Sequence, residues 1–136
     1  LFSIGKKLDL FDKYDNHKAH IHQKVLSFLP RYFVQMNGID VAEVVKHFTL
    51  FNQKFSVTGF DWQVDGDFFA HEYSIYRGDY TIATISKEWF TLGDAYAIDI
   101  TDGVEPANVI SVVLIIDAII SQARNNKASI SFDIFS

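Results

Sequence analysis

One stretch, Pro106 to Ala123 (PANVISVVLIIDAIISQA), constrains the fold of this chain more than any other. Proline suits the first turn of a helix, because its missing N–H would have no partner there. From Val109 to Ile120 only Ser111 and Asp117 are polar, so the middle turns have no continuous polar face. A helix that is apolar all round must be buried in a protein core or in a bilayer.

The length and charge of this stretch favour a protein core. A membrane-spanning helix needs about 20 apolar residues, whereas an apolar run of about 10–14 is more typical of a core helix. Asp117 would also cost about 2.5–3.5 kcal/mol at the centre of a bilayer. The sequence therefore predicts a buried core helix over 106–123 and no membrane span.

Composition limits the kind of protein. The 136 residues carry twelve Lys and Arg against seventeen Asp and Glu, a formal net charge of −5. This balance argues against nucleic-acid binding, which depends on phosphate neutralisation. The chain has no cysteine, which excludes a disulfide framework and a thiolate nucleophile. No signal peptide is visible, and a cytoplasmic location is expected, with peripheral membrane contact as the alternative.

Before the helix the sequence predicts short strands separated by turns. Asn37-Gly38 is the strongest hairpin signal, and Arg77-Gly78-Asp79 reads as another tight turn rather than as an adhesion motif. Strands at about ten-residue spacing indicate an antiparallel meander, barrel or sandwich. After the helix, Asn125-Asn126 predicts a break, and the alternation of apolar residues over 128–135 predicts a last strand.

An apolar helix among many strands needs an enclosing structure. A barrel closed around the helix buries it on all sides and removes exposed strand edges. The prediction is therefore a single domain over 1–136, mainly β with one helix, whose closed antiparallel β-barrel surrounds a buried hydrophobic C-terminal helix.

The segment from Ile85 to Ile120 resembles a known family. It runs ISKEWF over 85–90, then GDAYAIDI over 93–100, then the hydrophobic helix that carries Asp117. This pattern is similar to the LURP-one-related family, which belongs with the Tubby C-terminal-like and phospholipid-scramblase-like domains. The resemblance implies a β-barrel of about twelve strands around a hydrophobic helix. Bacterial members of the family mostly lack an assigned biochemical role.

The family's lipid activities do not carry over by residue. Tubby domains bind phosphoinositides with clustered basic side chains, but here only Lys6 and Lys7 are adjacent in the sequence. Scramblases place an acidic calcium-binding segment before a membrane-spanning helix, and this chain has no comparable segment. The favoured function is a non-catalytic binding or scaffold domain without a cofactor; peripheral binding of phospholipid or phosphoinositide is the alternative.

Two histidines form a weak candidate metal site. His20 and His22 lie on one face of a predicted strand, a spacing that zinc and copper sites use. Further ligands would have to come from His17, His47 or His71, whereas exposed polar residues on a solvent face explain the same pattern. We therefore predict no metal, with His20 and His22 as the alternative.

Asp117 is the most unusual residue of the helix. A buried carboxylate must be paired, hydrogen-bonded or neutral, so a structural acid and a ligand- or proton-binding group are both open. Lys87 has the same strand parity as Ile85 and Trp89 and is the predicted partner of Asp117. Lys87 and Asp117 are also the weak candidates for ligand binding.

Partners are expected to be a protein, a lipid or a small hydrophobic ligand. The aromatic residues that would supply apolar contact area, if exposed, are Trp62, Trp89, Phe90 and Tyr96. No Ser/His/Asp order, phosphate-binding glycine loop or pair of carboxylates indicates an enzyme.

Overall fold

The computed structural model describes residues 6–24, 30–48, 53–90 and 93–135; within these ranges the side chains at 48, 53, 89–90, 93–94 and 123–135 are not described. In these described ranges nine strands precede one helix: β1 (Lys7–Phe11), β2 (His17–Gln23), β3 (Arg31–Met36), β4 (Ile39–Phe48), β5 (Gln53–Thr58), β6 (Trp62–Asp67), β7 (Glu72–Arg77), β8 (Tyr80–Phe90), β9 (Gly93–Ile100) and α1 (Pro106–Phe135).

The strands form one antiparallel meander in which each strand pairs with the next. Short turns explain this order, because antiparallel neighbours can be joined by two-residue hairpins. Asn37 and Gly38 both have positive φ, 52° and 77°, as the predicted hairpin requires. The Arg77–Tyr80 pairing around Gly78 confirms the second predicted turn.

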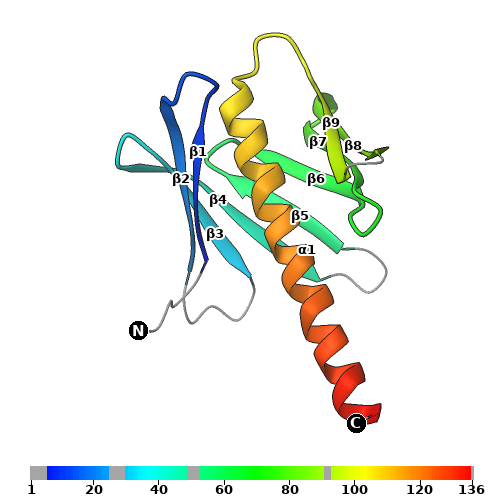
Figure 1. Ribbon diagram of the computed structural model, residues 1–136. Helices are drawn as coiled ribbons and strands as arrows, with labels where there is room; N and C mark the ends of the chain where they lie inside the picture. Colours follow the sequence, from blue (N-terminus) through cyan, green and yellow to red (C-terminus); the bar gives the residue numbers. More distant parts are fainter. Residues whose placement is uncertain (1–5, 25–29, 49–52, 91–92, 136) are drawn as a thin grey trace.

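The sheet curves around α1, which crosses its concave side between β1–β4 and β7–β9 (Figure 1). Side chains alternate along each strand, so one set points towards the helix and the other towards solvent. We call these the inner face and the outer face. The inner positions of β2 to β8 form the core together with α1; examples are Ile21, Val44, Phe55, Ile75 and Ile85.

The central helix is confirmed as a buried element. Val109, Val112, Ile115 and Ile116 are fully buried, and the hydroxyl of buried Ser111 donates to the carbonyl of Ala107 at 2.7 Å. In the described residues no helix is long and apolar enough to cross a membrane.

The predicted last strand over 128–135 is wrong, because α1 continues to Phe135. A helix completes its hydrogen bonds within its own segment, whereas a strand needs a neighbouring strand. The predicted break at Asn125-Asn126 costs a helix well under 1 kcal/mol per residue, which is too little to end it.

The fold class is confirmed as mainly β, with nine antiparallel strands and one C-terminal helix, but closure of a barrel is not. The described pairings run from β1–β2 to β8–β9 and include none between β1 and β9. Along one side of α1, Ile110, Leu114 and Asp117 are only half-buried. The described sheet is therefore open.

Candidate functional site

Asp117 lies in a polar cluster that joins α1 to β9 and to the turn between β6 and β7. The Tyr96 hydroxyl of β9 donates a hydrogen bond to Asp117 Oδ1 at 2.5 Å. His71, in the turn between β6 and β7, places Nδ1 3.3 Å from the Tyr96 hydroxyl oxygen and 3.9 Å from Asp117 Oδ1. We call Asp117, Tyr96 and His71 the Asp117 cluster.

The three groups differ in their access to solvent. His71 is 5% exposed, whereas Tyr96 is 37% exposed and the Asp117 side chain is 40% exposed. Because the Tyr96 hydroxyl donates its hydrogen to Asp117, its oxygen can accept a hydrogen bond from the Nδ1–H of His71. Such a chain of hydrogen bonds strengthens each member. Water therefore reaches the carboxylate end of the chain, while the imidazole end is enclosed.

Two backbone features place His71 and its neighbours. His71 has a left-handed φ of 57°, and its N–H donates to the carbonyl of Phe68 at 3.1 Å. Gly66, with φ +146°, is the register partner of Tyr73; a Cβ there would lie 2.6 Å from the Tyr73 Cα. The turn and the glycine together let the rings of Phe68 and Tyr73 pack beside the cluster.

Tyr73 places a buried phenolic hydroxyl next to this cluster. Burial raises the pKa of the Tyr73 hydroxyl, and the negative charges that Tyr96 and Asp117 can carry raise it further. The ring lies 5.3 Å from that of Phe68 and is almost completely buried. Tyr73 therefore stays protonated and gives the cluster a neutral, apolar wall.

The structural interpretation of Asp117 required a pairing or hydrogen-bonding partner, and the Tyr96 hydroxyl is a hydrogen-bonding one. The Lys87 partnership stays a prediction: Lys87 is half-buried and is the register partner of Tyr96, so it lies on the same inner row. Sequence reasoning placed Tyr96 on the correct face with Ile98 and Ile100, but nothing local identified His71 as a neighbour of Asp117.

His20 and His22 lie on the outer face of β2, as their alternation predicted. Asp9 of β1 contacts both His17 Nε2 and His20 Nδ1 through Oδ1 at 2.9 Å, and we call these three the Asp9 cluster. These hydrogen bonds hold the pKa of Asp9 below its usual value. His22 instead stacks between His20 and Phe33. No group of three or more His, Cys, Asp or Glu in the described residues could hold a metal ion.

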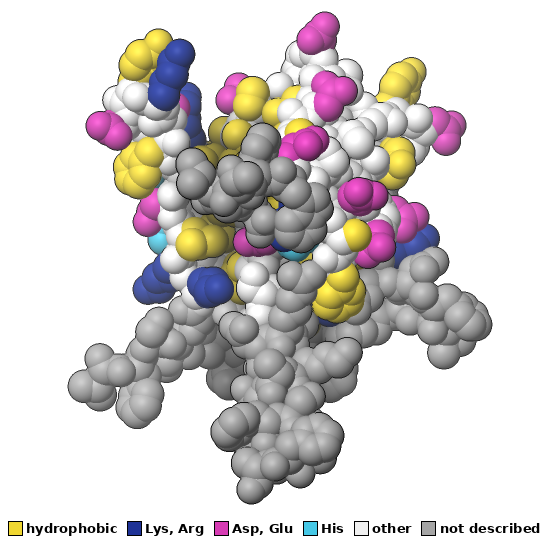
Figure 2. Space-filling view, turned by 45° about the vertical axis from the view of Figure 1, so that its right-hand side comes forward, with side chains coloured by type: hydrophobic (Ala, Val, Ile, Leu, Met, Phe, Trp, Pro, Cys, Tyr) yellow, Lys and Arg dark blue, Asp and Glu magenta, His cyan; other side chains and the backbone are white. Residues whose placement is uncertain are grey.

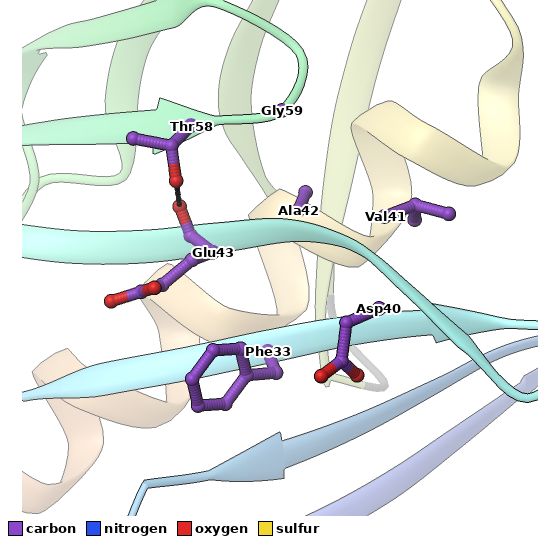
Figure 3. Close-up of a pocket in the computed structure, with 7 residues that line it drawn as sticks. All are labelled: Phe33, Asp40, Val41, Ala42, Glu43, Thr58 and Gly59. Carbon is purple, nitrogen blue, oxygen red and sulfur yellow. Dashed lines mark hydrogen bonds between the residues drawn. The ribbon is translucent and has the colours of Figure 1, made fainter.

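Two of the pockets that the described residues form lie on the sheet. The first, about 230 Å³, is wide open and is lined by Phe33, Asp40, Val41, Ala42, Glu43, Thr58 and Gly59 (Figure 3). The Thr58 hydroxyl donates to the Glu43 carbonyl at 3.4 Å across its floor. A Cβ at Gly59 would lie 2.2 Å from the Val41 carbonyl oxygen, so the close approach of the turn after β5 to β4 requires glycine.

The second pocket, about 310 Å³, is more enclosed and is lined by more polar side chains than the first. His47 Nε2 lies 2.6 Å from the Ser56 hydroxyl oxygen, and Lys54 Nζ lies 3.9 Å from Asp65 Oδ2. Gln63 and Tyr76 complete its polar lining. Neither pocket was visible from the sequence, because each depends on the register of three or four strands.

The hairpin end, formed by the turns at 12–16, 37–38, 59–61 and 78–79 and by residues 101–105, carries exposed apolar and acidic side chains. The large apolar ones are Phe11, Tyr14, Ile39 and Tyr80. The aspartates there are Asp12, Asp15, Asp40, Asp61, Asp79 and Asp102. Figure 2 shows acidic side chains scattered over the upper part of one face, among hydrophobic ones.

Of the aromatic residues proposed for contact, Trp62 is buried and Tyr96 is partly exposed within the Asp117 cluster. The side chains of Trp89 and Phe90 lie outside the described residues.

Comparison with known proteins gives one consistent result. The sequence model of the LURP-one-related family matches residues 1–117. The uncharacterized protein YxjI of Bacillus subtilis (strain 168) is 30% identical over 119 residues, which are 88% of this chain and 74% of YxjI. No solved structure matches.

Proposed function

Because the chain belongs to the LURP-one-related family, whose matched relative has no stated activity, we propose from its geometry that it is a non-catalytic binding domain. One observation carries this proposal: α1 fills the concave face of the sheet. Inner side chains from β2 to β8 form one buried cluster with the side chains of the helix, so the space that a ligand-binding barrel would offer is occupied by protein. A ligand or partner therefore binds the outer face or the ends.

The polar groups support binding rather than catalysis. In the described part of the chain no carboxylate contacts His47, so the His47–Ser56 pair lacks the third group that orients the base in hydrolytic triads. The Asp117 cluster bridges three elements and has a buried imidazole, which suits a structural link. Neither arrangement supplies a nucleophile, a base and an anion-stabilising donor at one point.

The test is to locate bound probes by nuclear magnetic resonance. Titration of the ¹⁵N-labelled chain with a fragment library is expected to shift amides of outer-face residues such as Ser56 and Gln63. Palmitate and an anilinonaphthalene dye are expected to leave the amides of α1 between 109 and 120 unchanged. Saturable shifts along α1 would show an internal cavity and contradict the proposal.

Peripheral membrane binding is the second candidate function, favoured by the exposed aromatic residues of the hairpin end. Aromatic side chains suit the bilayer interface, but the aspartates around them oppose anionic lipid. Co-sedimentation with neutral and anionic vesicles, at low and moderate salt, separates the two candidates. The favoured proposal expects no binding to either vesicle. Binding to neutral vesicles that salt does not weaken, or salt-sensitive binding to anionic vesicles, would replace it with the membrane function.

We also propose that the sheet closes around α1. Leu8 and Leu10 of β1 and Ile98 and Ile100 of β9 are half-buried on the inner sides of the two outermost described strands. Closure would bury these residues and pair the unpaired backbone groups of both strands. Hydrogen exchange is the test: slow exchange of the amides of β1 and β9 that point away from their described neighbours supports closure, and fast exchange contradicts it.

A further inference from the structure

The second pocket lies on the outer face where four strands run side by side. In the register of β4 to β7, Ser56, Gln63 and Tyr76 form one cross-strand row. His47 and Lys54, which pair directly, begin the next row, and Asp65 continues it on β6. Six polar side chains from four strands therefore surround one hollow of about 310 Å³.

The charges of this pocket cancel. Lys54 and Asp65 lie 3.9 Å apart and are each about half exposed, so they neutralise one another across the floor. An exposed pair of this kind is weak, but it leaves no net charge that would call for an ion. The pocket therefore favours a ligand without net charge.

The hydrogen-bonding groups are mixed in kind. Lys54 only donates and Asp65 only accepts, whereas Gln63, Ser56 and Tyr76 can do both. A hydroxyl group can accept from Lys54 and donate to Asp65 without separating them. Several hydroxyls on one rigid ring would match this set better than a single charged head group.

The remaining walls are apolar in character. Tyr76 is half-buried and lines the pocket, together with Phe55 of β5 and Val64 of β6. Aromatic faces contact C–H surfaces well, and ligand pockets of about 300–1,000 Å³ combine such surfaces with a few polar groups. The volume is at the lower end of that range and suits one or two six-membered rings.

We propose that this pocket, lined by His47, Lys54, Ser56, Gln63, Asp65 and Tyr76, binds a neutral polyhydroxylated ring, the chemistry of a sugar unit. The proposal deepens the proposed function, since it names a ligand class for the outer face. An open pocket with one aromatic wall gives a Kd of about 1–10 mM for a single small ring.

The test is a titration of the ¹⁵N-labelled chain with glucose, galactose, N-acetylglucosamine and maltose. At least one sugar is expected to shift the amides of Gln63, Tyr76 and Gly78 in a saturable manner. Glycerol serves as the hydroxyl control without a ring, and benzoate and glycine betaine serve as the charged and zwitterionic controls. All three controls are expected to leave these amides unchanged.

Variants tie the shifts to the pocket. Gln63→Ala and Asp65→Ala are each expected to raise the Kd of the bound sugar about tenfold. Each variant removes a side chain that hydrogen-bonds to the sugar hydroxyls in place of water. Asp40→Ala, in the first pocket, is the matched control and is expected to leave the Kd unchanged. The ¹⁵N spectrum of each variant shows whether the fold is kept.

Three results would overturn the proposal. These are no shift with any sugar at about 100 mM, ten times the weakest expected Kd; sugar-induced shifts away from this pocket; or shifts here with benzoate or betaine alone. The last result would leave the proposed outer-face function standing with a different ligand class. Shifts along α1 in the same spectra would instead count against the proposed function itself.

Discussion

Two carboxylates in this molecule have similar partners in very different settings. Asp117 accepts a hydrogen bond from Tyr96 and lies near His71, and these residues come from α1, β9 and the β6–β7 turn. Asp9 contacts His17 and His20, both on the neighbouring strand of one hairpin. The first cluster encloses its imidazole, whereas in the second Asp9 and His17 are exposed and His20 is only partly buried.

The difference shows that connectivity and burial, rather than the chemical groups, decide what such a cluster does. The Asp117 cluster fixes the helix to the last strand, so losing it loosens elements that are distant in sequence. The Asp9 cluster connects residues that the β1–β2 hairpin already holds together, and exposed pairs contribute little. We therefore expect substitutions near Asp117 to destabilise the fold and substitutions near Asp9 to have little effect.

The largest effect is expected where the backbone makes room for the Asp117 cluster. Gly66→Ala would place a Cβ 2.6 Å from the Glu72 carbonyl oxygen and would force alanine to adopt φ +146°. Such a backbone conformation alone costs about 1–3 kcal/mol. Urea unfolding should show a loss of at least this size. Gly103→Ala, with positive φ but nothing within 4 Å, is the control and should cost less. Equal losses would show that the close approach does not matter.

His71 tests the enclosed end of the cluster. His71→Ala removes the contact with Tyr96 and keeps a left-handed φ that alanine disfavours, so we expect a loss of about 2 kcal/mol. His71→Asn should lose less, because asparagine tolerates φ above zero. The free energy of unfolding at neutral pH measures both. If both variants were as stable as the wild type, the imidazole would have no structural role.

Tyr73 predicts how stability changes in alkali. Burial raises the pKa of its hydroxyl above the ordinary value of 10.0, so the folded state keeps a proton that the unfolded state releases. The stabilisation is complete below about pH 10 and is lost as the pH rises further. Tyr73→Phe should flatten this alkaline limb in urea unfolding between pH 8 and 11. An exposed control, Tyr80→Phe, should leave the limb unchanged.

The smallest effect on stability is expected for a substitution of Asp9, and it should appear at acid pH. Hydrogen bonds from His17 and His20 lower its pKa, so its contribution is present above the usual carboxyl range and is lost as the pH falls through that range. Because the cluster is exposed, Asp9→Asn should leave Tm at pH 7 unchanged within error and flatten the acid limb slightly. A large fall in Tm at pH 7 would remove the contrast with Asp117.

Local signals explain what could be predicted from the sequence. The Asn37-Gly38 hairpin, the alternating strands and the apolar helix depend on neighbouring residues, and all three are confirmed. The Tyr96–Asp117 bond and the His71 contact join residues 21 or more positions apart, which one sequence does not show. The setting of Lys46 could not be predicted from the sequence either. Lys46 lies on the inner face of β4, where burial lowers the pKa of its ammonium group.

The strand predicted over 128–135 was wrong because a local signal was trusted where the structure depends on distant residues. Alternation of Ile130, Phe132 and Ile134 is a local signal, but a strand also needs a partner, and the described chain continues as helix there. The outer-face pockets were missed because their residues are polar, scattered along the chain and unremarkable one by one.

The most direct test is a double-mutant cycle in urea with Tyr96→Phe and Asp117→Ala, because alanine removes both carboxylate oxygens, whereas asparagine would keep an oxygen that accepts from Tyr96. Tyr32→Phe is the control, because the buried Tyr32 hydroxyl has no hydrogen-bond partner in the described residues and its removal should be neutral or stabilising. If Tyr96 and Asp117 form the structural link between β9 and α1, each single variant loses about 1–2 kcal/mol, and the double variant loses clearly less than their sum. Additive losses within about 0.5 kcal/mol would contradict this account.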